Sequence, residues 1–70
     1  MMPLTMAEAG RKNIIRRVGG NAEIRKHLEG LGFVPGSEVT VVSTIGGNVI
    51  VSVKESRIAI SKEMANKILV

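Results

Sequence analysis

Glu23 and His27 are the residues of this chain whose types and spacing come nearest to a metal site. They lie four residues apart in a segment with a helical pattern, so both side chains project from one face of the predicted helix. A first-row metal ion needs four or more donors, and nothing in the sequence brings Glu29 or Glu55 to the pair. We therefore predict no metal site, with Glu23 and His27 as the candidate ligands if one exists. The alternative is an ion pair on the helix surface.

The available residue types argue against a catalytic centre. The chain has no cysteine and no aspartate, and His27 is its only histidine, which argues against a cysteine nucleophile, a thiolate zinc site and a Ser-His-Asp triad. Its 70 residues allow one domain, spanning 1–70, and leave no room for a large enclosed cofactor pocket. We predict a protein that is not an enzyme and that has no cofactor and no small-molecule substrate.

Basic side chains outnumber acidic ones and gather near the N-terminus. Ten lysines and arginines against six glutamates give a net charge of +4 and a sequence pI near 10.2. Six of the ten lie in three pairs, Arg11-Lys12, Arg16-Arg17 and Arg25-Lys26. If these pairs share a face, they suit phosphates or carboxylates; otherwise they form an ordinary solvated surface. A single Phe, with no Tyr or Trp, argues against a platform for stacking bases.

A single helix is predicted over about 21–31. Asn21 is a suitable N-cap, and Gly32 suits the left-handed position that follows a helix C-terminus. Apolar residues recur between them at helical spacing on one face: Ile24, Leu28 and Leu31.

The segment Asn13–Val18, before the helix, alternates like a strand, but its inward side is not determined. Ile14 and Val18 share one face, and Ile15 lies on the other. Further upstream, Leu4 is expected to anchor the first ten residues to the core.

Two β-branched runs after the helix predict a hairpin across Gly46-Gly47. Alternation places Ile45 on the inward face with Val39, and leaves Val42 and Ile50 facing outward. The remaining predicted elements are a strand at Arg57–Ile60 after a reversal at Lys54–Ser56, a helical turn at Lys62–Ala65 capped by Ser61, and a terminal strand at Ile68–Val70.

Together these elements predict a mainly β fold: a small, partly closed barrel of about five strands with one inserted helix and a short helical turn near the C-terminus. The core is predicted to contain Ile24, Leu28, Leu31, Phe33, Val41, Val51 and Ile60. No apolar run approaches the ~20 residues that span a bilayer, and the first residues lack the pattern of a signal peptide. We therefore expect a cytoplasmic protein.

The order of these landmarks resembles one known family. Leu28–Val39 reads Leu-Glu-Gly-Leu-Gly-Phe-Val-Pro-Gly-Ser-Glu-Val, which is similar to the Leu-x-x-Leu-Gly-Phe-x-Pro-Gly-x-x-Val stretch of the ferrous iron transport protein A (FeoA) family. Val49–Val53 and Arg57–Ile60 look like that family's second hairpin, and residues 65–70 match its closing Ala-x-x-Ile-x-Val. The likeness covers nearly the whole chain.

The resemblance implies an SH3-like barrel with the helix inserted after the first strand. It also implies an accessory or regulatory role in ferrous iron uptake, by contact with the cytoplasmic GTP-binding region of the ferrous iron permease, ferrous iron transport protein B. The membrane would then be reached only through that permease. Two positions depart from the family pattern. Glu55-Ser56 stands where the family often has Gly, which implies a different turn type, and His27 stands where Arg is common.

Contact with a protein partner is expected to use basic residues together with outward β-branched ones. The candidates are Arg16, Arg17, His27, Val42, Ile50 and Arg57. The alternative function is an SH3-like nucleic-acid-binding domain that uses its basic surface, although the shortage of aromatic residues makes nucleic acid the less favoured partner. An exposed terminal strand at Ile68–Val70 would also allow a homodimer.

Overall fold

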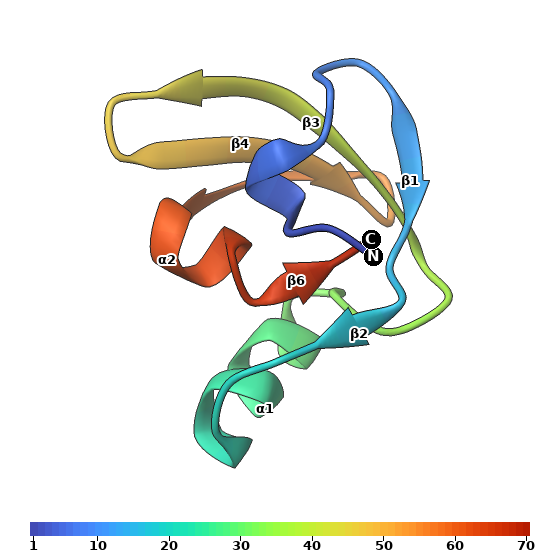
Figure 1. Ribbon diagram of the computed structural model, residues 1–70, viewed down its shortest axis with the longest axis vertical. Helices are drawn as coiled ribbons and strands as arrows, with labels where there is room; N and C mark the ends of the chain where they lie inside the picture. Colours follow the sequence, from blue (N-terminus) through green and yellow to red (C-terminus); the bar gives the residue numbers. More distant parts are fainter.

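Two antiparallel sheets enclose the core of the computed structural model, which describes residues 1–70 (Figure 1). The larger sheet has the strand order β1-β3-β4-β5, and the smaller sheet pairs β2 with β6. In chain order the elements are a 3-10 turn η1 (Leu4–Met6), β1 (Lys12–Ile14), β2 (Arg17–Val18), α1 (Ala22–Gly30), β3 (Glu38–Ile45), β4 (Asn48–Val53), β5 (Ser56–Ser61), α2 (Lys62–Ala65) and β6 (Ile68–Leu69). The predicted mainly β barrel with one inserted helix is confirmed.

The core is one cluster of buried side chains, all of them hydrophobic. Five of the predicted core residues are buried: Leu28, Phe33, Val41, Val51 and Ile60. The other two, Ile24 and Leu31, are half-buried and pack against the cluster from α1. Leu4 is fully buried, as expected for the anchor of the N-terminal segment.

The predicted single strand Asn13–Val18 is wrong, because the chain changes sheets in its middle. The Ile15 amide donates to the Ser37 carbonyl at 2.9 Å, on the side of the larger sheet, while the next amide, that of Arg16, donates to Leu69 at 2.8 Å. This corner turns Ile15 inward, where its side chain is 1% exposed, and leaves Ile14 45% exposed. Val18 is buried like Ile15 and unlike Ile14. The predicted pattern, with Ile14 and Val18 on one face and Ile15 on the other, is therefore wrong.

Helix α1 begins and ends at the residues that its sequence signals indicate. The Asn21 side chain accepts a hydrogen bond from the Ile24 amide at 2.9 Å. At the other end the Gly32 amide donates to Glu29 and the Phe33 amide to Leu28, while Gly32 has a φ of +105°. These bonds form a Schellman motif, and its hydrophobic contact joins Phe33 to Leu28, both fully buried. The short α2 is likewise capped by the Ser61 hydroxyl, which accepts from the Met64 amide at 3.2 Å.

The hairpin of β3 and β4 is confirmed, but a β-bulge changes which side chains face inward. Val41 pairs with Val51, whereas Ile50 pairs with Ser43, so Val42 is the extra residue. Beyond the bulge the alternation of β3 is reversed, and Ile45 is 66% exposed instead of inward-facing.

Strand β6 is paired along both edges, so the predicted exposed terminal strand is wrong. On one side Arg17 and Val18 pair with Leu69 and Ile68. On the other side, Met2 and Val70 exchange two backbone hydrogen bonds of 2.9 Å, and Pro3 forms a bridge to Leu69. A homodimer through this strand would have to break one of these pairings, which removes that basis for self-association.

The turn between β4 and β5 has positive φ at both central residues. Lys54 has a φ of 47° and Glu55 a φ of 65°, and the flanking Val53 and Ser56 pair directly. These are the features of a type I′ turn, which favours Asn-Gly because L residues there are strained. Glu55 thus adopts a conformation that a glycine would favour, and the expectation that the turn type differs from that of the family stays a prediction.

The corner in the first strand predicts opposite outcomes for two adjacent isoleucines. Ile15→Ala removes a side chain from the core and should lower the free energy of unfolding by about 2–5 kcal/mol. Ile14→Ala, the matched control at an exposed position, should cost less than about 1 kcal/mol. Urea denaturation of both variants measures the difference, and equal losses would contradict the assigned corner.

The strained turn predicts a stabilising substitution. Glu55→Gly relieves the left-handed conformation and should raise the free energy of unfolding by about 0.5–1 kcal/mol, or several degrees in Tm. Thr44→Gly, at an exposed strand position without positive φ, should instead lose about 0.5–1 kcal/mol. A fall in Tm for both variants would show that Glu55 is not strained.

Candidate partner-binding surface

Three of the six candidate contact residues, Val42, Ile50 and Arg57, lie together on the outer face of the larger sheet. Val41 and Val51 point into the core, so their neighbours along the strands point outward. Ile50 pairs with Ala59 on β5, and Arg57 lies two residues before Ala59, on the same face. Val42 is the extra residue of the bulge, next to Ser43, which pairs with Ile50. This group, called the sheet-face group below, has two half-buried apolar side chains beside an exposed arginine.

The other three candidates, Arg16, Arg17 and His27, lie at the end of the molecule formed by β2 and α1. All three are exposed, and none of them lies on a strand of the larger sheet, which carries the sheet-face group. Arg16 and Arg17 are consecutive in extended chain, so their side chains diverge. The structure therefore divides the predicted contact set into two groups instead of bringing it together.

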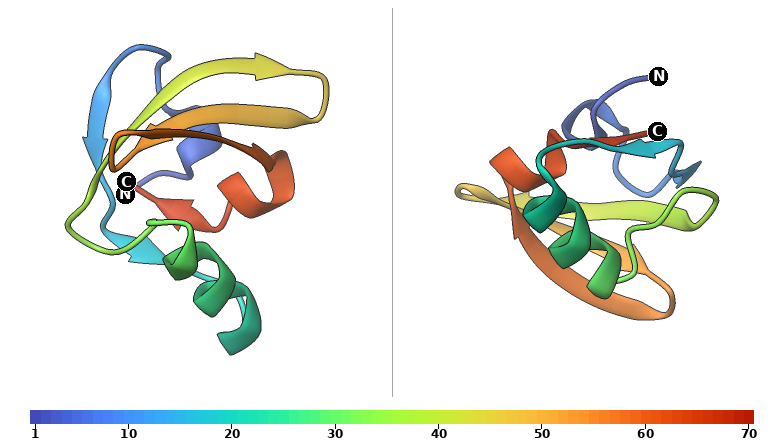
Figure 2. Two further views of the ribbon diagram at one scale, coloured as in Figure 1. Left: turned by 180° about the vertical axis from the view of Figure 1, so that it is seen from behind. Right: turned by 90° about the horizontal axis from the view of Figure 1, so that it is seen from below.

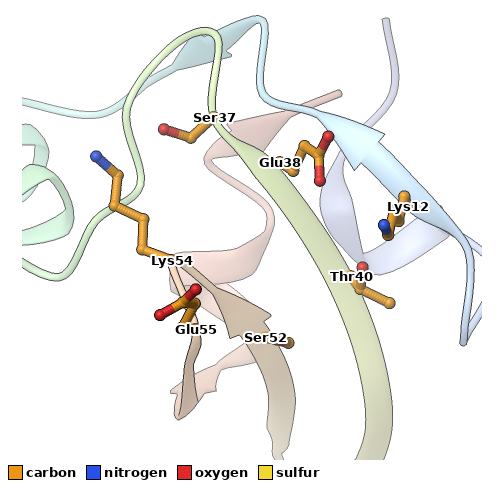
Figure 3. A pocket seen from close by; sticks show the side chains of 7 residues that line it. All are labelled: Lys12, Ser37, Glu38, Thr40, Ser52, Lys54 and Glu55. Carbon is orange, nitrogen blue, oxygen red and sulfur yellow. The ribbon is translucent and has the colours of Figure 1, made fainter.

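A polar hollow of about 290 Å³ opens beside the sheet-face group and was not foreseen from the sequence (Figure 3). Its floor follows the register of the sheet, where Lys12 pairs with Thr40 and Thr40 pairs with Ser52. The lining residues are all polar or charged: Lys12, Ser37, Glu38, Thr40, Ser52, Lys54 and Glu55. In the sequence, Thr40 and Ser52 alternate with buried valines, which indicates that they face outward. Which of these outward residues lie side by side follows only from the strand register.

Arg57 continues this polar row, because it pairs with Ser52 on the next strand. The row thus crosses all four strands and has a basic residue at each end, Lys12 and Arg57. No ion pair engages either residue, since the one salt bridge in the structure joins Arg11 to Glu8. Both charges are therefore available to acidic groups of a partner.

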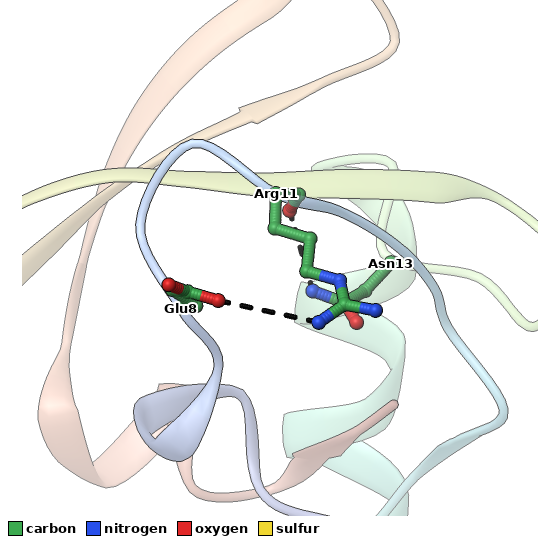
Figure 4. Close-up of polar contacts among 3 residues, drawn as sticks. All are labelled: Glu8, Arg11 and Asn13. Atoms are coloured by element: carbon green, nitrogen blue, oxygen red, sulfur yellow. Dashed lines mark hydrogen bonds and ion pairs between the residues drawn. The ribbon is translucent and has the colours of Figure 1, made fainter.

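A second hollow, of about 360 Å³, lies near the N-terminus. It is lined by Met2, Met6, Glu8, Arg11 and Asn13. The Arg11 guanidinium lies 4.0 Å from the Glu8 carboxylate, and the Asn13 amide donates to the Arg11 carbonyl at 3.3 Å (Figure 4). Both ionic side chains are more than 70% exposed, so this pair adds little stability.

Glu23 and His27, the candidate metal ligands, are exposed on α1. No group of three or more His or Glu side chains lies close enough together to hold a metal ion. Neither Glu29 nor Glu55 therefore completes a site with them.

The basic pairs Arg11-Lys12, Arg16-Arg17 and Arg25-Lys26 are all exposed, but on different elements. Phe33, the only aromatic residue, is fully buried in the core. No aromatic side chain is thus available to stack on a base, although contact with phosphates does not require one. None of the helices has the length and hydrophobicity needed to cross a membrane.

Comparison with known proteins connects this fold to one family. A family model described as the FeoA domain matches residues 2–70. The chain is 34% identical to a Methanocaldococcus jannaschii protein named as an Fe(2+) transport protein A, over 100% of this chain and 85% of that protein.

Solved structures show the same likeness. An iron uptake regulatory protein (FeoA) has a TM-score of 0.87 and 29% identity, covering 96% of this chain and 91% of the other. The zinc complex of Stenotrophomonas maltophilia FeoA, described as an SH3 domain protein, has a TM-score of 0.85 and 27% identity, covering 99% and 88%. The predicted SH3-like barrel is thereby confirmed.

The exposed pair on α1 predicts no specific ferrous iron site. In an anaerobic titration of the chain with Fe²⁺, followed by calorimetry, His27→Ala and the unsubstituted chain should give the same signal, because two exposed ligands leave the ion mostly hydrated. His27→Gln is the control for a change in helix surface alone. Saturable binding that His27→Ala abolishes and Glu23→Gln weakens would contradict this prediction.

Proposed function

Because this chain belongs to the FeoA domain family, we propose that it is an accessory protein of ferrous iron uptake that binds the cytoplasmic GTP-binding region of the ferrous iron permease. The observation that carries the proposal is the family match over residues 2–70, nearly the entire chain. The protein acts in the cytoplasm, where that region of the permease lies, and reaches the membrane only through it. Its effect is exerted by protein contact, which biases assembly, nucleotide turnover or gating of the permease.

The sheet-face group is the contact surface that we assign to this partner. Interfaces combine an apolar centre with a polar rim and are enriched in arginine. Val42 and Ile50 supply an apolar centre, while Arg57 and Lys12 supply charged positions beside it. The group at β2 and α1 has charges without such a centre, so it is the less suitable of the two.

The net charge of the whole chain also favours an acidic partner. The chain has a net charge of +4, which raises the rate of encounter with an acidic surface at moderate ionic strength. Such steering weakens with salt, whereas burial of Val42 and Ile50 does not. Binding to the permease should therefore decline only moderately as salt rises, in contrast to the steep decline expected for nucleic acid.

The test is direct binding of the chain to the purified cytoplasmic domain of the permease, by calorimetry or biolayer interferometry. Arg57→Glu and Ile50→Lys should each weaken binding tenfold or more, because central arginine and apolar contacts contribute about 1.4 kcal/mol or more each. Lys62→Glu, an equal charge reversal at an exposed position outside the group, is the control and should change affinity less than threefold. Unchanged Tm values show that the variants are folded.

Two results would overturn parts of this proposal. Absence of binding at high micromolar concentration, with and without guanine nucleotide, would contradict the permease as partner. Binding that Arg16→Glu abolishes and Arg57→Glu leaves intact would place the contact on the β2 and α1 end instead of the sheet-face group.

A further inference from the structure

Strand β5 leaves one of its edges unpaired. Its six residues, Ser56–Ser61, pair with β4 along their whole length and with no other strand. Figure 2 shows β5 as the outermost strand of the larger sheet. The other outer strand of that sheet, β1, has only three residues. β5 is thus the longest free edge of the molecule.

The backbone groups that point away from β4 follow from the register. The two-residue turn closes on Val53 and Ser56, so this pair is hydrogen-bonded, and every second pair after it is hydrogen-bonded as well. The alternation continues beyond the strand, where the Lys62 amide donates to the Gly47 carbonyl at 3.1 Å. Arg57, Ala59 and Ser61 lie between these pairs, and their amides therefore point outward.

Little protects this edge against another strand. Folded proteins protect long edges with prolines, bulges, inward-pointing charges or several lysines. β5 contains no proline, has an unbroken register with β4, and carries a single charged residue, Arg57. Its other side chains are small or aliphatic, and Ile58, on the inward face, is only half-buried.

We infer that β5 pairs antiparallel with β5 of a second copy of this chain, about a two-fold axis at Ala59. The two Ala59 residues then exchange a pair of backbone hydrogen bonds, and each Ser61 amide donates to the Arg57 carbonyl of the other copy. The Ser61 carbonyl is not needed, which leaves it free to accept the first hydrogen bond of α2.

Side chains fit this register on both faces of the joined sheet. On the outer face Arg57 lies opposite Ser61, so no like charges face each other across the axis. On the inner face Ile58 lies opposite Ile60 of the other copy, which covers the exposed part of Ile58. An edge that matches itself in hydrogen bonds, charge and size is the requirement for a two-fold symmetric interface. The inference does not rest on the proposed function, although the two share Arg57, whose backbone pairs in the dimer and whose side chain is assigned to the permease contact.

A single introduced cysteine tests this arrangement. Because the chain has no cysteine, Ala59→Cys would place two thiols across the axis, with Cα atoms about 5.5 Å apart, within the range of disulfides. Mild oxidation should give a covalent dimer within minutes. Thr44→Cys, an exposed position on β3, is the matched control and should cross-link at least tenfold more slowly. Equal rates for the two variants would overturn the inference.

Sedimentation equilibrium and amide exchange provide the test without a cross-link. The unsubstituted chain should move from 7.5 kDa towards twice that mass as its concentration rises, and the amides of Ala59 and Ser61 should become protected in parallel, whereas the Arg57 amide gains no acceptor and should not. Ala59→Pro removes an outward amide that β4 does not use, so it should remain folded and monomeric. Ala59→Thr keeps the amide and should still dimerise.

Three outcomes would overturn this arrangement. They are a chain that stays monomeric at millimolar concentration, a dimer that Ala59→Pro leaves intact, and protection of the Ala59 and Ser61 amides only after the permease domain is added. The last outcome would assign the edge to a strand of the permease.

Discussion

Closure of the barrel depends on backbone pairing at strand β6, which is only two residues long. Its neighbours on one side come from β2 and on the other from Met2 and Pro3, so segments from three parts of the chain meet there. Ile68 and Val70, on and next to this strand, are buried in the core with Leu4 and Val18. If β6 separates, the smaller sheet has no partner and the core opens along one side.

The same core accounts for where chemistry can occur in this molecule. All of its buried residues are hydrophobic, and both hollows lie on the surface and are lined mainly by polar residues. A chain of this size needs its whole interior for stability, because small domains bury a limited share of their surface. Specificity therefore has to come from the outer face of the larger sheet, from its edges or from the exposed charges around them.

Local signals predicted the elements that depend on local interactions. The caps at Asn21 and Gly32 and the reversals around Gly46-Gly47 and Lys54–Ser56 involve residues close in sequence, so the sequence pattern shows them. The corner at Ile15 was not predictable, because it depends on partners at Ser37 and Leu69, far along the chain.

For the candidate contact surface too, the sequence predicted the features that depend on local interactions and missed those that depend on distant partners. Outward placement of Val42 and Ile50 followed from alternation, and the resemblance to a known family pointed to the barrel. The polar hollow and the separation of Arg57 from Arg16 require the strand register and the turn of the chain between sheets. The bulge at Val42 likewise reverses the alternation for Ile45 without any glycine or proline to mark it.

The pairing of Met2 with Val70 also sets the order of events during synthesis. The contact has nearly the largest sequence separation that these residues allow, and contacts of this kind form slowly because a long loop must be closed first. Until residues 68–70 leave the ribosome, the smaller sheet cannot form and Leu4 and Ile15 lack part of their packing. Nascent chains of this domain therefore remain open and exposed to chaperones and proteases until translation has passed its final residue.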